Sequence, residues 1–180
     1  DALVANAHKW MYSPKAGAIL YVDPKWQSKI QPAVIGSENA NAKDFAGRFA
    51  YTGTRSYNAM IAVDAAMDYR DTLGNDAIMK YLKQLAWEGA AACMKAWGMT
   101  VETGLIVPSP DMNAGIIDVI LPTQNGSKVR AAADGLLEKY DTYIQCGVYE
   151  GSHYVRLSAQ IYLELSDFEL FATRFLELAA

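Results

Sequence analysis

The chain opens on the stretch ALVANAHKWMYSPKAGAILYV, residues 2–22, in which two short apolar runs flank a polar loop. The apolar runs predict two short buried strands, and the loop carries Lys9 between His8 and Trp10. A lysine at the mouth of a strand, with such neighbours, suits an amine that forms an imine, which requires a partly desolvated and neutral side chain. Most lone lysines are solvated instead, so the rest of the chain must distinguish the two interpretations.

The composition is that of an ordinary globular protein, with 52% hydrophobic and 20% charged residues among 180. A net charge of −4 without a basic stripe argues against a nucleic-acid binder. The two cysteines, Cys93 and Cys146, form no CxxC motif, which favours a reducing compartment such as cytoplasm or an organelle matrix. No apolar run reaches membrane-spanning length, and no cluster has the spacing of metal ligands.

The first part of the chain predicts a short helix from Pro24 to residue 30, an irregular loop over 31–50 and a helix from Ser56 to residue 73. A long helix follows over 76–97, with Cys93 on its apolar stripe. At about 1.5 Å per residue this helix is long enough to bridge two domains.

The last part of the chain alternates predicted strands and helices. Strands are expected over 101–107, 116–121, 143–149 and 154–157, and helices over 127–140 and after a capping box at 166–169. We therefore expect an α/β chain with the end of a larger α/β domain over 1–73, a bridging helix over 74–100 and a small α+β domain over 101–180.

Two further motifs can bind anions. The turn Thr52-Gly53-Thr54 precedes a predicted helix, so its amides and hydroxyl can face an anion, although such a tripeptide alone is usually a plain cap. Arg156 shares a strand face with Tyr154 and Ser158, and its guanidinium can clamp a carboxylate through two parallel hydrogen bonds. The alternative for Arg156 is a salt-bridged sheet arginine.

Together, His8-Lys9-Trp10 with residues 13–22, the turn Tyr51-Thr52-Gly53-Thr54 and residues 155–162 resemble one family in motif and order. This family is the class V aminotransferase superfamily of fold-type-I pyridoxal-phosphate enzymes, and the resemblance is to its isopenicillin N epimerase-like branch. Family members are much longer, and their lysine lies past the middle. The resemblance implies that this chain is the C-terminal half, with residues 1–73 the end of the cofactor-binding domain.

The resemblance also implies a role for each site residue. Lys9 would form the imine with pyridoxal 5′-phosphate and move the substrate α-proton, while His8 and Asn6 contact the phosphate. Gly53 and Thr54 would reach the phosphate of the other subunit across a dimer interface, and Arg156 would grip the α-carboxylate of an amino-acid substrate. A packed His8 and a turn-forming Asn6 remain the structural alternatives.

The subfamily resemblance favours an epimerase or racemase, with an aminotransferase or a carbon–sulfur lyase as alternatives in the same superfamily. A different class is an inactive subunit that acts as a scaffold in a larger assembly. The expected partners are an amino acid, the missing N-terminal half in the same or a separate polypeptide, and a homodimer or larger assembly. Cys146 lies in a predicted strand, which disfavours a desulfurase nucleophile.

Overall fold

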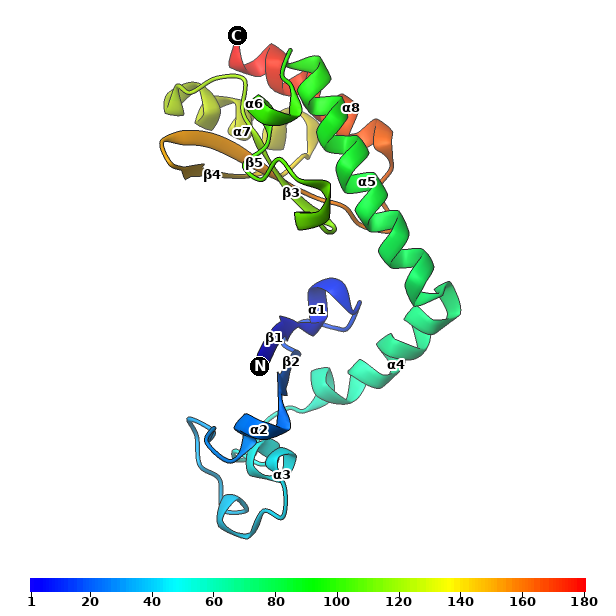
Figure 1. The fold of residues 1–180 in the computed structure, drawn as a ribbon, viewed down its shortest axis with the longest axis vertical. Coiled ribbons are helices and arrows are strands. Elements are labelled where there is room, and N and C mark those ends of the chain that lie inside the picture. Colours follow the sequence, from blue (N-terminus) through cyan, green and yellow to red (C-terminus); the bar gives the residue numbers. More distant parts are fainter. The chain divides into compact units, whose positions relative to one another are not determined.

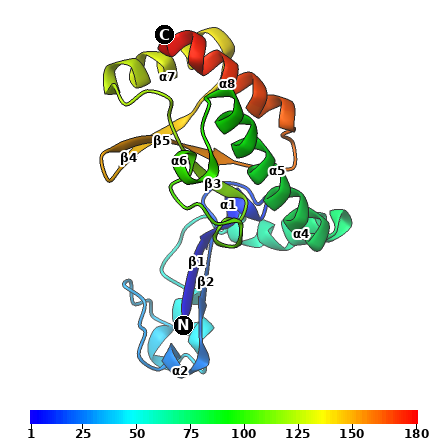
Figure 2. The same cartoon turned by 45° about the horizontal axis from the view of Figure 1, so that its top comes forward.

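A computed structural model describes residues 1–180, and the chain divides into two compact units, Asp1–Gly74 and Asn75–Ala180. Figures 1 and 2 show the helices and strands of each unit from two directions. The predicted α/β class is confirmed. The bridging role of residues 74–100 stays a prediction, and the helix in this range packs within the second unit.

The first unit begins with the two predicted strands, β1 (Ala2–Asn6) and β2 (Ala18–Val22), which pair as an antiparallel hairpin. The register pairs Ala2 with Val22 and Asn6 with Ala18. Between the strands, residues Ala7–Trp10 form α1, a single helical turn where the sequence indicated only a loop. Ala7 N donates to Gly17 O at 3.0 Å and closes this connection at its base.

The apolar side chains of the hairpin are exposed, so the prediction of buried strands is wrong for these residues of the chain. Leu3 is 54% exposed and Val4 74% exposed, whereas Val22 is buried. The physical reason is that a two-stranded sheet has two faces and this unit supplies few residues to cover either of them.

The rest of the first unit consists of short helices and one long helix: α2 (Pro24–Gln27), η1 (Asn39–Asn41), α3 (Phe45–Ala50) and α4 (Asn58–Leu73). The helix predicted over 24–30 is shorter than expected, and the loop predicted over 31–50 contains α3. Asp44 caps α3 by accepting from Gly47 N at 2.7 Å. The long helix begins at Asn58, after an N-cap at Tyr57, and not at Ser56.

The second unit is a three-stranded antiparallel sheet with helices against it. The strand order is β3 (Ile116–Ile120), β5 (Ser152–Ser158) and β4 (Gln145–Tyr149). Helix α5 (Asn75–Ala96) contacts β3, β5 and α8 (Leu165–Ala179), and α8 also contacts α7 (Gly126–Tyr140). The largest fully buried core side chains are Cys93, Ile117, Val119, Leu121, Leu136, Val155 and Phe175.

Two boundaries in the second unit differ from the prediction. Residues 101–107 were expected to form a strand, but Val101–Gly104 form the short helix α6, which Thr100 and Thr103 cap, and only Leu105 bridges to Val119. Helix α8 begins at Leu165, because Asp167 Oδ2 accepts from Glu164 N at 2.8 Å. The capping box is therefore formed by Glu164 and Asp167 and not by the residues predicted at 166–169.

The packing of α5 against α8 depends on a glycine. A Cβ added at Gly89 would lie 2.7 Å from Cγ of the buried Phe168, so only glycine permits this approach. A Pro110–Met112 turn (η2) precedes β3. No helix of the structure combines the length and apolar character needed to cross a bilayer.

Candidate functional site

The Lys9 side chain projects from α1 and is exposed in this structure. The ion pairs of the first unit join Lys25 to Asp1 and Asp23, and they leave the Lys9 amine unpaired. The first unit by itself therefore does not supply the partly desolvated environment that an imine lysine requires. The proposed role of Lys9 stays a prediction.

The backbone around Lys9 is firmly held. Met11 N and Ser13 N both donate to Ala7 O, at 3.2 and 3.3 Å, which closes the turn behind the lysine. Ser13 is buried, and its hydroxyl approaches Ala59 O in the first turn of α4 at 3.5 Å. The lysine turn is thus attached to the long helix of the same unit.

Arg70 is a second attachment point, and the sequence reasoning missed it. Its side chain is only 6% exposed, and Nη1 donates to the carbonyl of Trp10, the residue after Lys9. The guanidinium also lies 5.2 Å from the ring centroid of Tyr12, whose φ of 61° is unusual for a residue other than glycine. An arginine in a helix is normally expected to be solvent-exposed, so nothing in the sequence around Arg70 indicates that its side chain is buried.

His8 is held by the hairpin, as its structural alternative predicted. Its Nδ1 lies 3.3 Å from Gly17 O, and because a carbonyl only accepts, Nδ1 carries the hydrogen. In the neutral ring Nε2 is then an acceptor, so His8 can donate to a phosphate only as the imidazolium. Asn6 is exposed at the end of β1, and its side chain caps no backbone group of α1.

The turn containing Gly53 and Thr54 is open. Gly53 has φ of 116°, and a Cβ there would meet nothing within 4 Å, while Thr54 is exposed. Tyr57 donates its hydroxyl to Gly53 O at 2.8 Å and so attaches the turn to the N-cap of α4. The turn precedes the helix by several residues, so its amides are not the first amides of the helix, and the expected dipole contribution is weakened.

Arg156 lies in the second unit, at the centre of its sheet. Nε donates to Asp118 Oδ1 at 2.9 Å and Nη2 to Oδ2 at 3.1 Å, so the salt-bridged alternative is observed. The hydrogen bond to Asp118 is the main cause that raises the pKa of Arg156 above its ordinary value. As predicted, Val155 and Leu157 are buried on the opposite face of β5. Asp118 was not singled out from the sequence, although its place between buried Ile117 and Val119 indicates that it faces outward.

A cavity of about 420 Å³ lies against Arg156, within the size range of small-molecule sites. Its lining comes from β5, the first turns of α8, and the segments that lead into β4 and follow β5. It includes Tyr143, Gln145, Arg156, Ser158, Tyr162 and Asp167. The contact of Arg156 with this cavity is compatible with binding of a small carboxylate.

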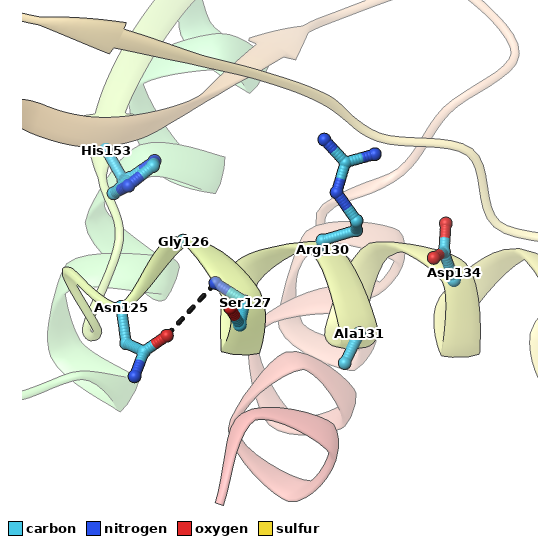
Figure 3. Close-up of a pocket in the computed structure, with 7 residues that line it drawn as sticks. All are labelled: Asn125, Gly126, Ser127, Arg130, Ala131, Asp134 and His153. Carbon is cyan, nitrogen blue, oxygen red and sulfur yellow. Dashed lines mark hydrogen bonds between the residues drawn. The ribbon is translucent and has the colours of Figure 1, made fainter.

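A second hollow lies at the N-terminus of α7 and shares no residue with the predicted site (Figure 3). It is lined by Asn125, Arg130, Asp134 and His153, and Asn125 Oδ1 accepts from Ser127 N at 3.0 Å. The Asn125 side chain therefore already caps the helix. His153 is half-buried here.

Neither cysteine has the character of a nucleophile. Burial raises the pKa of the Cys93 thiol to about 12, and Cys93 lies in the core as predicted. Cys146 is half-buried in β4, and burial raises its pKa as well. Both thiols therefore remain protonated near neutral pH.

Known structures define the class of this fold. A solved NifS-like protein matches 99% of this chain with a TM-score of 0.67 at 19% identity, and the chain covers 46% of it. An 8-amino-7-oxononanoate synthase from Francisella tularensis matches 98% of the chain with a TM-score of 0.58. The chain has the mixed α/β fold of the fold-type-I pyridoxal-phosphate enzymes.

The sequence comparison identifies the family. Residues 1–141 match the model of aminotransferase class-V, and the chain belongs to this family. An L-cysteine desulfhydrase-like protein (lolT1) from Epichloe uncinata is 31% identical over 94% of this chain. A hercynylcysteine sulfoxide lyase from Schizosaccharomyces pombe is 30% identical over 93%. The chain spans 48% and 43% of these relatives, about half their length. Membership of the family implies pyridoxal 5′-phosphate as the cofactor.

Proposed function

We propose that the protein containing this chain is a pyridoxal-phosphate-dependent carbon–sulfur lyase that acts on a cysteine-derived amino acid. The observation that carries the proposal is the similarity, over more than nine-tenths of this chain, to relatives named for cysteine desulfhydrase and sulfoxide lyase activity. These names do not support the epimerase expected from the subfamily resemblance. The carbon–sulfur lyase, which was an alternative, replaces it as the leading hypothesis.

The donor set of the first unit fits the proposed cofactor. Lys9 is exposed and its amine is unpaired, and Thr54 is exposed as well. The turn at Gly53 is open, because a Cβ added there would have no atom within 4 Å. Lys9 would hold the cofactor covalently, and the Asn6 amide would donate to its phosphate. The Thr54 hydroxyl would donate to the phosphate of the cofactor in the other subunit. When bound, pyridoxal phosphate supplies the electron sink for negative charge at the substrate Cα.

The chain's own residues would then bind and orient the substrate. Arg156 would hold the α-carboxylate, which fixes the direction in which the Cα–H bond points. Lys9 Nζ would take the proton from Cα as a general base. Because Lys9 is exposed in this chain, we propose that residues outside it complete the desolvated wall around the amine.

The protonated thiols of the two cysteines support a lyase that releases the substrate sulfur directly, without transfer to the enzyme. Transfer of sulfur to the enzyme would require a thiolate, and burial keeps Cys93 and Cys146 protonated near neutral pH. In a direct elimination the sulfur leaves with the bond electrons from Cβ, and no protein thiol accepts it.

Product analysis of the purified native protein with L-cysteine tests this proposal. A lyase of this kind converts L-cysteine into sulfide, pyruvate and ammonia in equal amounts. A second incubation with a cysteine S-conjugate sulfoxide tests whether an oxidised sulfur leaving group is preferred. Formation of D-cysteine, or amino transfer to a keto acid, would reject the lyase. An absence of all these reactions in cofactor-loaded protein would favour the scaffold alternative.

A further inference from the structure

Asp118 and Arg156 occupy directly opposed positions on neighbouring strands of the sheet. The register of β3 and β5 pairs the two residues, and their side chains lie on the face away from the buried Val119 and Val155. Each carboxylate oxygen accepts one hydrogen bond, from Nε at 2.9 Å and from Nη2 at 3.1 Å. This two-point contact fixes the plane of the guanidinium as well as its position.

The contact leaves part of the guanidinium free. Arginine has five N–H donors, and Asp118 uses two of them along one side of the group. Both hydrogens of Nη1 and the second hydrogen of Nη2 remain. One Nη1 hydrogen and the remaining Nη2 hydrogen form the end-on pair that suits a second carboxylate. Asp118 can therefore hold Arg156 without occupying the donors that would meet a substrate.

The residue on the other side of Arg156 does not share this task. Gln145 is the register partner of Arg156 on β4, but its Nε2 donates to Cys146 O and its Oε1 accepts from Tyr143. The Asp118 side chain is 24% exposed and that of Arg156 43%, and ion pairs with this much solvent contribute little to stability. Orientation is a better account of the pair than folding stability.

We infer that Asp118 is a positioning residue, which holds the Arg156 guanidinium so that its end-on donors face the α-carboxylate of the substrate. This inference rests on the proposed role of Arg156 and deepens it. Asp118 touches neither substrate nor cofactor in this account. It determines how well an amino acid with a carboxylate is distinguished from the corresponding amine.

The test uses two probes that differ only in the carboxylate, L-alanine and ethylamine. Their dissociation constants are measured by titration of the cofactor absorbance in native protein, so no substrate turnover is needed. Asp118→Asn keeps the shape of the side chain but places an amide opposite the guanidinium. We expect it to weaken L-alanine binding by about threefold to tenfold, with ethylamine unchanged. Asp118→Glu keeps the carboxylate and should restore most of the lost affinity.

Three outcomes overturn the inference. If Asp118→Asn weakens both probes equally, Asp118 has only a structural role. If L-alanine binds more tightly, Asp118 competes with the substrate for the guanidinium. If L-alanine binding is unchanged, Arg156 does not need Asp118. The matched control is Glu138→Gln, which neutralises an exposed carboxylate on α7 and should change neither constant.

Arg156→Lys separates this inference from the proposed function. If the proposed role of Arg156 is correct, this variant loses at least about tenfold in L-alanine affinity and little for ethylamine. If Arg156→Lys affects neither probe, the proposed carboxylate site itself is wrong. If Arg156→Lys weakens L-alanine binding more than ethylamine binding and Asp118→Asn does not, only the positioning role of Asp118 is wrong.

Discussion

Arg70 on α4 donates a hydrogen bond to the carbonyl of Trp10, which lies 60 positions earlier and directly follows Lys9. A buried cation thus holds the exit of the turn that presents the proposed cofactor-binding amine. The same guanidinium packs over the ring of Tyr12, so it joins two consecutive parts of the loop. The long helix of the first unit serves as the support for this loop.

Replacement of Arg70 by Met should loosen the lysine turn. The Trp10 carbonyl would lose its donor, and we expect the free energy of unfolding to fall by about 1–3 kcal/mol. The affinity for pyridoxal phosphate should fall as well, because the backbone that carries Lys9 is less fixed. Urea unfolding and a cofactor titration measure the two effects. Arg130→Met, at an exposed position on α7, is the control. Equal behaviour of the two variants would contradict the anchoring role.

Replacement of Lys9 by Ala should abolish turnover without weakening the fold. The side chain is exposed and unpaired, so its loss is expected to change the free energy of unfolding by less than about 0.5 kcal/mol. Lys15→Ala removes an exposed lysine from the same loop and should retain full activity. Activity and thermal unfolding of both variants are measured together. Normal turnover by Lys9→Ala would remove Lys9 from the mechanism.

Replacement of Gly89 by Ala should destabilise the second unit despite the higher helix propensity of alanine. The new Cβ would meet the Phe168 ring at 2.7 Å, and overpacking of a buried site costs about 1–3 kcal/mol. This exceeds the propensity gain of about 1 kcal/mol at most. Gly135→Ala is the matched comparison, because its Cβ would meet only the end of Leu178, at 3.0 Å. Thermal unfolding should rank Gly89→Ala clearly below Gly135→Ala, and the reverse order would refute the packing argument.

Cys93 should make stability fall at high pH. Its pKa is raised from 9.0 to about 12 by burial, so the unfolded chain loses the thiol proton before the folded chain does. The contribution of the Cys93 thiol to the free energy of unfolding is complete below pH 9. It is lost between pH 9 and about 12, at up to about 1.4 kcal/mol per pH unit. The slope of unfolding free energy against pH, compared between wild type and Cys93→Ala, isolates this effect. Identical slopes would show that Cys93 titrates normally in the fold.

The sequence predicted those parts of the structure that short-range patterns determine. Local periodicity predicted the two strands around Lys9, the helices observed over 75–96 and 126–140, and the alternation of Val155, Arg156 and Leu157. The strand predicted over 101–107 was wrong, because the cap formed by Thr100 and Thr103 favours a helical turn over the strand pattern. Asp118 and Arg70 were missed, because each acts on a residue at least 38 positions away, and no spacing rule connects such pairs.

The exposure of Lys9 is the most informative disagreement. The motif predicts a desolvated amine, yet the first unit leaves the side chain in solvent. The chain spans about half of its curated relatives, and the proposed function assigns the missing part of the wall to residues outside it.

Borohydride reduction of the purified native protein, followed by peptide mass mapping, tests the central claim most directly. Reduction fixes pyridoxal phosphate on the nitrogen that holds it. The account predicts that the added mass lies on the peptide containing Lys9, and that Lys15 in the same loop stays unmodified. Cofactor fixed on a different lysine, or cofactor-saturated protein without any adduct at Lys9, would contradict it.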